Sequence, residues 1–199
     1  MIRWYHLILT TYGFWLPNDP RGSWSDFVAS WELYKFGPAT KVSNKRSYAH
    51  DPHDVALRRA AKGALKYPPV RLNERQRSLV VQGFAEAVAT AGYSAFAGCV
   101  GYDHAHLVIG RHDERTIEQI ARHLKSKATM HLVRAGLHPL REYVVAGGSS
   151  STPWAGKCWS VFINDEQQLR AAIAYVERHP LKEGLSPGRW TFLAHFEGC

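Results

Sequence analysis

Apolar and polar positions alternate along the chain with two different periods, and this pattern predicts most of its secondary structure. Residues 4–12 (WYHLILTTY) are rich in β-branched and aromatic side chains and predict a first strand. From Asn73, apolar residues recur every three or four positions until Gly92, which predicts an amphipathic helix. Gln76 stands three residues after Asn73, so the two side chains can form a capping box at the helix start.

Two strands and a second long helix follow in the middle of the chain. Residues 93–103 (YSAFAGCVGYD) and 104–111 (HAHLVIGR) predict an antiparallel pair joined by a tight turn near Tyr102 and Asp103. The helical spacing of apolar residues returns in residues 116–136 and ends at a glycine. The order up to this point is β, α, β, β, α.

The last part of the chain adds one strand and one helix. Residues 158–164 (CWSVFIN) predict the fourth strand. Asn164 is the expected N-cap of the next helix, with Gln167 at the capping-box position, and Pro180 is expected to stop that helix. The complete order, βαββαβ plus a C-terminal helix, predicts an α+β protein with a ferredoxin-like split βαβ fold and an antiparallel sheet.

A long irregular stretch interrupts this pattern after the first strand. Residues 13–69 are punctuated by Pro, Gly, Trp and Asn, and only residues 54–66 have a helical pattern. So long a connection after a strand is usually functional or disordered. We therefore expect a single domain over residues 1–199, with residues 13–69 as an irregular, basic and aromatic insertion.

The histidine pair in YDHAHLVIG (102–110) is the first candidate for chemistry. Residues two apart on a strand share a face, so His104 and His106 are expected to project from the same side. Their Cα atoms would lie roughly 6.5 to 7 Å apart, which lets both rings reach one metal ion. In a chain with eleven histidines this spacing also arises by chance, and on the spacing alone two ordinary histidines are favoured.

Tyr175 and His179 form a second candidate, on the predicted C-terminal helix. Their four-residue spacing places them together along the edge of its apolar stripe. A tyrosine that keeps its hydroxyl in water and a histidine favoured by the helix dipole are the plainer explanation of this pair. Pro180 also disfavours helical geometry at His179, which leaves open a site of two histidines completed by water.

The composition favours a polyanionic partner. The sequence has 25 Lys and Arg against 17 Asp and Glu, a formal charge of +8. Nucleic acid fits this charge better than a membrane, because the sequence has neither a run of 18 apolar residues nor a basic helix with a strongly apolar face. The first residues lack the apolar segment of a secretory signal, and the three cysteines are scattered, so we expect a cytoplasmic protein.

The insertion mixes aromatic and basic residues, as surfaces that bind single-stranded nucleic acid do. Packing onto the core is the plainer role for any one of its tryptophans. The expected DNA contacts are five residues of the insertion and two cations of the second long helix. They are Arg21, Trp24, Lys41, Lys45, Arg46, Arg122 and Lys125.

The two candidates together resemble a known arrangement. His-Ala-His on a central strand, followed by YVERHPLKEGL (175–185) at a helix end, resembles the HUH single-strand nucleases, in which U is a hydrophobic residue. The sequence is most similar to the REP-associated tyrosine transposase branch of the single-tyrosine transposases. The resemblance covers residues 4–12 and about 73–193. Tyr102 and Asp103 stand where the family often has Pro-Asn before the first histidine.

This resemblance implies a site. His104 and His106 would bind a divalent metal ion, Tyr175 would be the nucleophile, and His179 would complete the metal site in place of the family's usual Asn or Gln. Imidazole suits Mn²⁺ better than the hard ion Mg²⁺. The expected cofactor is therefore a divalent ion, Mn²⁺ or Mg²⁺, with Mn²⁺ favoured.

The implied reaction is cleavage of single-stranded DNA to a 5′-phosphotyrosine and a free 3′-OH, followed by transfer of the held end to another 3′-OH. Tyrosine has a free pKa of about 10 and needs activation, and its phosphate ester conserves the bond energy, so rejoining needs no ATP. Single-stranded or hairpin DNA is the expected partner, bound by a monomer or homodimer. Two alternatives stay open: a domesticated, non-catalytic binder of such DNA, and a histidine-metal hydrolase that activates water.

Overall fold

The computed structural model describes residues 3–16, 19, 31–37, 53–111, 114–143 and 151–196. The chain divides into two compact units, residues 12–70 and residues 1–11 with 71–199. Five of the expected DNA contacts belong to the insertion and lie outside the described residues: Arg21, Trp24, Lys41, Lys45 and Arg46.

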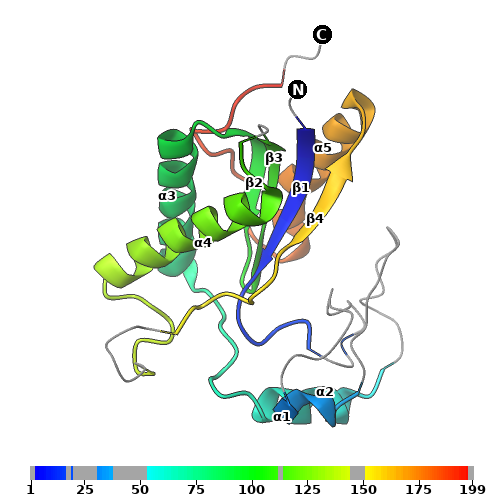
Figure 1. The fold of residues 1–199 in the computed structure, drawn as a ribbon, viewed down its shortest axis with the longest axis vertical. Coiled ribbons are helices and arrows are strands. Elements are labelled where there is room, and N and C mark those ends of the chain that lie inside the picture. Colours follow the sequence, from blue (N-terminus) through cyan, green and yellow to red (C-terminus); the bar gives the residue numbers. More distant parts are fainter. Residues whose placement is uncertain are drawn as a thin grey trace. The chain divides into compact units, whose positions relative to one another are not determined.

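The described part of the larger unit is built on a four-stranded sheet (Figure 1). The order is β2-β3-β1-β4, and every neighbouring pair is antiparallel. The βαββαβ order around an antiparallel sheet, with a further helix at its end, confirms the predicted α+β fold class. The strands are β1 (Arg3–Thr10), β2 (Ser94–Val100), β3 (His104–Arg111) and β4 (Trp159–Ile163).

Two long helices begin where polar residues cap them. α3 (Glu74–Ala91) follows Asn73, whose side-chain oxygen accepts from the Gln76 amide at 3.0 Å, while Gln76 Oε1 accepts from the Asn73 amide at 2.9 Å. α4 (Ile117–Arg134) has the same reciprocal box at its own start. Each box pairs backbone N–H groups that a helix start otherwise leaves unpaired, so the sequence fixes both boundaries.

The C-terminal helix α5 (Glu166–Lys182) differs from the prediction at both ends. Its N-cap is Asp165 and not Asn164, because Asp165 accepts from the Gln168 amide at 2.8 Å. Asn and Asp are both good N-caps, and Asn164 and Asp165 each have a Gln three residues later. The sequence therefore did not distinguish a helix capped by Asn164 from one capped by Asp165. The prediction that Pro180 stops the helix is wrong. Pro180 lies in the last turn, where its missing N–H removes one backbone hydrogen bond and the preceding turns stay intact.

Different helices cover the two faces of the sheet (Figure 1). α5 packs on the face that carries Val108 and adds Leu169 and Val176 to an apolar cluster there. α3 and α4 lie on the opposite face, to which the fully buried Leu107 points. By strand alternation the histidine pair of β3 shares the face of Val108 and therefore lies beneath α5.

The smaller unit contains two helices among its described residues, α1 (Trp31–Tyr34) and α2 (Val55–Gly63). α2 begins after Asp54, whose carboxylate accepts from the Leu57 amide at 2.8 Å, in agreement with the helix expected over 54–66. α1 was not predicted, because a single turn has no apolar period to detect. A small core in this unit is formed by Leu16, Phe36 and Ala61.

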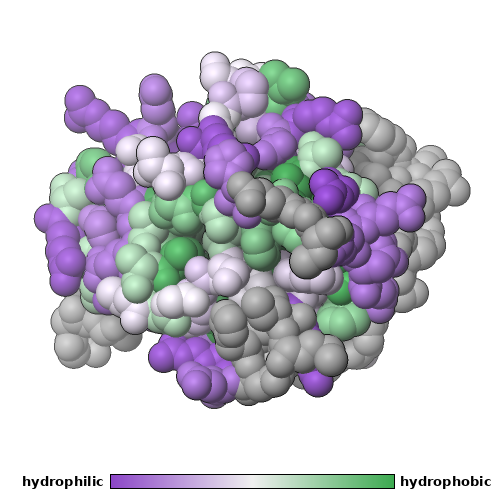
Figure 2. All heavy atoms as spheres, turned by 90° about the horizontal axis from the view of Figure 1, so that it is seen from above, coloured by the Kyte–Doolittle hydropathy of each residue, from purple (hydrophilic) through white to green (hydrophobic). Residues whose placement is uncertain are grey.

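Polar residues dominate much of the visible surface. On the face shown in Figure 2, hydrophilic residues surround a central group of more apolar ones. Large exposed apolar side chains, such as Phe162 on β4 and Leu181 on α5, belong to different elements, as is normal for a globular protein. Among the described helices, none has the length and apolar character that crossing a membrane requires.

Candidate metal centre and nucleophile

A short turn (101–103) places the histidine pair at the start of β3. The Gly101 amide donates to the carbonyl of His104 at 2.8 Å, which closes the turn between β2 and β3. The amide of Thr11 donates to the carbonyl of Asp103 at 2.9 Å, so the end of β1 is fastened to the same turn. The predicted tight turn is confirmed, and the first histidine follows it directly.

Three histidines, two from β3 and one from α5, converge between the sheet and α5. The ring centroids of His104 and His106 are 4.8 Å apart, and those of His106 and His179 are 4.2 Å apart. One ligand nitrogen from each ring lies within 4.8 Å of the others. Two metal–nitrogen bonds of about 2.1 Å span at most about 4.2 Å, so small ring rotations suffice for the three rings to share one ion. Because α5 continues through Pro180, the ring of His179 faces β3 and does not turn away from it.

Burial keeps these rings in the form that binds a metal. His106 and His179 are 4% and 9% exposed. Burial lowers the pKa of His106 well below its ordinary value, and burial, followed by the charges of His104 and Lys182, lowers the pKa of His179 to about 4. Both rings are therefore neutral at physiological pH, as metal coordination requires. His106 Nε2 is buried without a hydrogen-bond partner among the described residues, which also fits a nitrogen reserved for an ion.

Two carboxylates flank His104. Its Nδ1 lies 2.6 Å from Asp103 Oδ1 and 3.7 Å from Glu183 Oε1. Glu183 Oε2 also accepts a hydrogen bond from the Tyr102 amide at 3.2 Å. Asp103, His104 and Glu183 form a second group with the spacing of a metal site. Gly101 makes room for this carboxylate, because a Cβ there would overlap the side chain of Glu183.

Tyr175 lies one turn before His179 on α5, at the open side of the histidine cluster. Its ring centroid is 5.5 Å from that of His179 and 5.9 Å from that of His106, and the residue is 40% exposed. Partial burial raises the pKa of the phenol, so the hydroxyl is protonated at neutral pH. The Lys182 ammonium lies 4.5 Å from the centroid of the Tyr175 ring. The nucleophile expected from the sequence is thus accessible and adjacent to two of the candidate ligands.

His6 on β1 also belongs to this cluster. Its Nε2 lies 2.9 Å from Nδ1 of His106, and its ring centroid is 5.7 Å from that of Tyr175. Burial lowers the pKa of His6 to about 4, so this ring is neutral as well.

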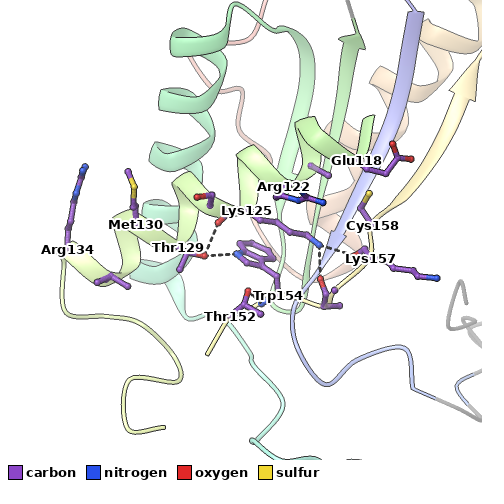
Figure 3. Close-up of a pocket in the computed structure, with 15 residues that line it drawn as sticks. Glu118, Arg122, Lys125, Thr129, Met130, Arg134, Thr152, Trp154, Lys157 and Cys158 are labelled. Atoms are coloured by element: carbon purple, nitrogen blue, oxygen red, sulfur yellow. Dashed lines mark hydrogen bonds between the residues drawn. The ribbon is translucent and has the colours of Figure 1, made fainter. Parts of the chain in front are cut away.

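The two predicted DNA contacts that the structure describes, Arg122 and Lys125, line a groove elsewhere on the larger unit (Figure 3). The groove has a volume of about 1000 Å³ and runs between α4 and residues 152–158. Lys125 Nζ donates to the carbonyls of Ala155 and Lys157 at 2.7 and 2.9 Å, and burial lowers its pKa to about 8. Arg122 is exposed. None of the described residues that line the groove belongs to the histidine cluster.

Comparisons with known proteins find similar solved structures, including the following two. No family model matches the sequence, and no curated protein matches it. The structure of a REP-associated tyrosine transposase bound to a REP hairpin is 11% identical, with 93% of this chain and 70% of that chain covered and a TM-score of 0.47. The crystal structure of a candidate transposase from Deinococcus radiodurans R1 is 12% identical, with 94% of each chain covered and a TM-score of 0.40. At this similarity neither structure assigns a family, or a role for any residue, to this chain.

Sequence reasoning missed two members of the cluster, Glu183 and His6. Glu183 follows His179 by four residues and Tyr175 by eight, but this helical spacing extends beyond Pro180, where the helix was expected to end. His6 lies in a predicted strand, but its place beside His106 depends on how β1 pairs with β3, which no local pattern encodes.

Proposed function

We propose that this protein is a metal-dependent single-stranded DNA transesterase that uses Tyr175 as its nucleophile. The observation that carries the proposal is the convergence of Tyr175 with His104, His106 and His179, from a strand and a helix far apart in sequence. Isolated buried histidines are ordinary, but three converging imidazoles next to an accessible phenol together supply the metal ligands and the nucleophile that phosphodiester transfer needs.

The three histidines are the residues that would hold the ion, because their nitrogens lie close together and burial keeps His106 and His179 neutral. A divalent cation bound there would draw charge from the non-bridging phosphate oxygens as the transition state forms. Asp103 supports His104 in this role, since its carboxylate accepts from Nδ1 and directs Nε2 away. Imidazole ligands favour Mn²⁺ over Mg²⁺.

Tyr175 supplies the atom that attacks. Its phenolic oxygen would form a bond to phosphorus, while the bond from phosphorus to the 3′ oxygen breaks and the departing oxygen takes up a proton to become a 3′-OH. The DNA 5′ end is then held as a phosphotyrosine, and the reverse attack by another 3′-OH rejoins it. Because the pKa of Tyr175 is raised, its proton must be removed as attack begins, and water can take it, since the residue is 40% exposed.

The proposed partner is single-stranded or hairpin DNA. The charge of +8 supports this class. In the groove along α4, Arg122 and Lys157 are exposed and can meet phosphates, while Lys125 holds the 155–157 backbone in place. The insertion residues Arg21, Trp24, Lys41, Lys45 and Arg46 remain proposed DNA contacts on their sequence pattern.

A second candidate function is metal-assisted hydrolysis by an activated water. It is favoured by Glu183, which adds a second carboxylate beside Asp103 at 3.7 Å from the His104 ring. Such a carboxylate can serve as a general base for water, and Tyr175 would then have no role in bond cleavage.

One experiment separates these functions. The protein is incubated with 5′- or 3′-labelled single-stranded and hairpin DNA in Mn²⁺, and the products are run under denaturing conditions. A DNA–protein adduct that resists denaturant and is lost in Tyr175→Phe supports the transesterase. Tyr143→Phe is the matched control, since Tyr143 is also 40% exposed but lies away from the cluster. Free cleaved products without an adduct indicate a hydrolase, and a mobility shift without cleavage indicates a non-catalytic binder.

A further inference from the structure

We propose that His6 is a positioning residue of the metal centre, which accepts the Nδ1–H of His106 and so holds the His106 ring with Nε2 toward the ion. This inference rests on the metal centre of the proposed function. It adds to that centre a residue of β1, a strand that lies outside both the His-Ala-His and the YVERHPLKEGL motifs.

The contact is close and specific. His6 Nε2 and His106 Nδ1 are 2.9 Å apart, an ordinary hydrogen-bond length between two ring nitrogens. β1 pairs with β3 so that His106 faces Ile8, and His6 stands two residues along on the same face. A diagonal neighbour on an adjacent strand is within reach of a long or aromatic side chain. The backbone of the sheet therefore fixes the geometry of this pair.

The hydrogen bond selects one tautomer of His106. An N–H···N bond between two neutral imidazoles needs one donor and one acceptor. If His106 Nδ1 carries the proton, it donates a hydrogen bond to His6 Nε2, and His106 Nε2 keeps a lone pair for an ion. If the proton sits on His106 Nε2, this nitrogen cannot coordinate. His106 Nε2 has no hydrogen-bond partner among the described residues, whereas Nδ1 has one in His6, so the first arrangement fits the structure.

The same principle operates at the other histidine of β3. His104 Nδ1 is engaged by Asp103 at 2.6 Å, so a carboxylate sets the tautomer there while an imidazole sets it at His106. A residue that orients a metal-binding histidine in this way contributes to ligand basicity and ring orientation. His6 also packs against the Tyr175 ring with centroids 5.7 Å apart, so it contacts both a candidate ligand and the candidate nucleophile.

The test measures Mn²⁺ affinity by calorimetry, without DNA, for the full-length wild type, His6→Phe and His6→Gln. His6→Phe keeps a flat ring but cannot accept, and should weaken Mn²⁺ binding about 10- to 100-fold. His6→Gln restores an acceptor oxygen and should recover much of the affinity. His123→Phe is the control: His123 makes an equivalent ring contact, Nδ1 to the Tyr93 hydroxyl at 3.1 Å, between α4 and residue 93, and its loss should leave affinity within about twofold of wild type.

A second measurement does not depend on whether a variant folds. Nitrogen-15 NMR of histidine-labelled, metal-free wild type should show His106 protonated at Nδ1 and unprotonated at Nε2. The opposite tautomer, or a folded His6→Phe with wild-type Mn²⁺ affinity, would overturn the role of His6 while leaving the metal centre intact. Failure of the wild type itself to bind Mn²⁺ would overturn the metal centre and this inference together.

Discussion

Burial of uncharged histidines at the candidate metal centre predicts a loss of stability in mild acid. In the folded, metal-free protein the pKa of His179 is lowered from 6.5 to about 4, mainly by burial, and burial alone lowers that of His6 to about 4. Between about pH 4 and pH 6.5, His6 and His179 are protonated in the unfolded chain but not in the folded protein. The free energy of unfolding therefore falls as the pH drops from 6.5 toward 4, and is unaffected by these groups well above 6.5.

The size of the loss follows from these pKa values. For one histidine with a pKa of 6.5 unfolded and about 4 folded, the free energy of unfolding drops by about 1.8 kcal/mol between pH 7 and pH 5. His6 and His179 together account for about 3.5 kcal/mol on this basis. The pKa of the buried His106 is lowered too and adds to the loss in the same direction. Against a typical total stability of about 5 to 15 kcal/mol, such a loss is large.

Urea denaturation of the metal-free protein at pH 7, 6 and 5 measures this effect. His179→Asn removes one of the titrating rings and should recover about half of the loss calculated for His6 and His179. Leu169→Ala, at a fully buried position on the same helix, is the control: it should lower stability by about 2 to 5 kcal/mol at every pH without changing the slope. Parallel pH profiles for the wild type and His179→Asn would refute the reasoning.

Three further outcomes are expected. His179→Asn restores the amide usual in the resembled family and should shift the ratio of cleavage rates in Mn²⁺ and Mg²⁺ toward Mg²⁺; an unchanged ratio means that His179 does not bind the ion. Affinity for single-stranded or hairpin DNA, measured by fluorescence anisotropy, should fall steeply with salt and exceed that for blunt duplex, and equal affinity for the two would contradict the proposed partner. Gly101→Ala should displace the Glu183 carboxylate, break its bond to the turn and cost about 1 kcal/mol in urea denaturation, whereas Gly188→Ala, with open space around it, should cost less; equal costs would argue against this packing.

Local polar signals made much of the fold predictable. Asn73 with Gln76 and Gly92 bounds α3 in the sequence as in the structure, because capping depends on residues a few positions apart. The period-two pattern of HAHLVIGR likewise fixed which side chains of β3 share a face. Tyr175 and His179 were placed together by helical spacing and lie together in α5.

The remainder of the cluster depends on contacts between distant segments. His6 is 100 residues from His106, and only the register of β1 against β3 brings their nitrogens together. Glu183 was hidden by the rule that proline ends helices, which holds for interior positions but is relaxed in a last turn whose residues are packed. Pro180 is itself buried, so tertiary packing outweighed a local preference here.

The mounting of Tyr175 and His179 on one helix has a mechanical consequence. The other two candidate ligands belong to β3, an inner strand held by hydrogen bonds on both sides, whereas α5 is attached to the sheet through side-chain packing at positions such as Leu169 and Val176. A rigid-body shift of α5 would withdraw the nucleophile and one ligand in a single movement. Tyr175 and His179 would therefore move away from His104 and His106 together, because one helix carries the nucleophile and one candidate ligand.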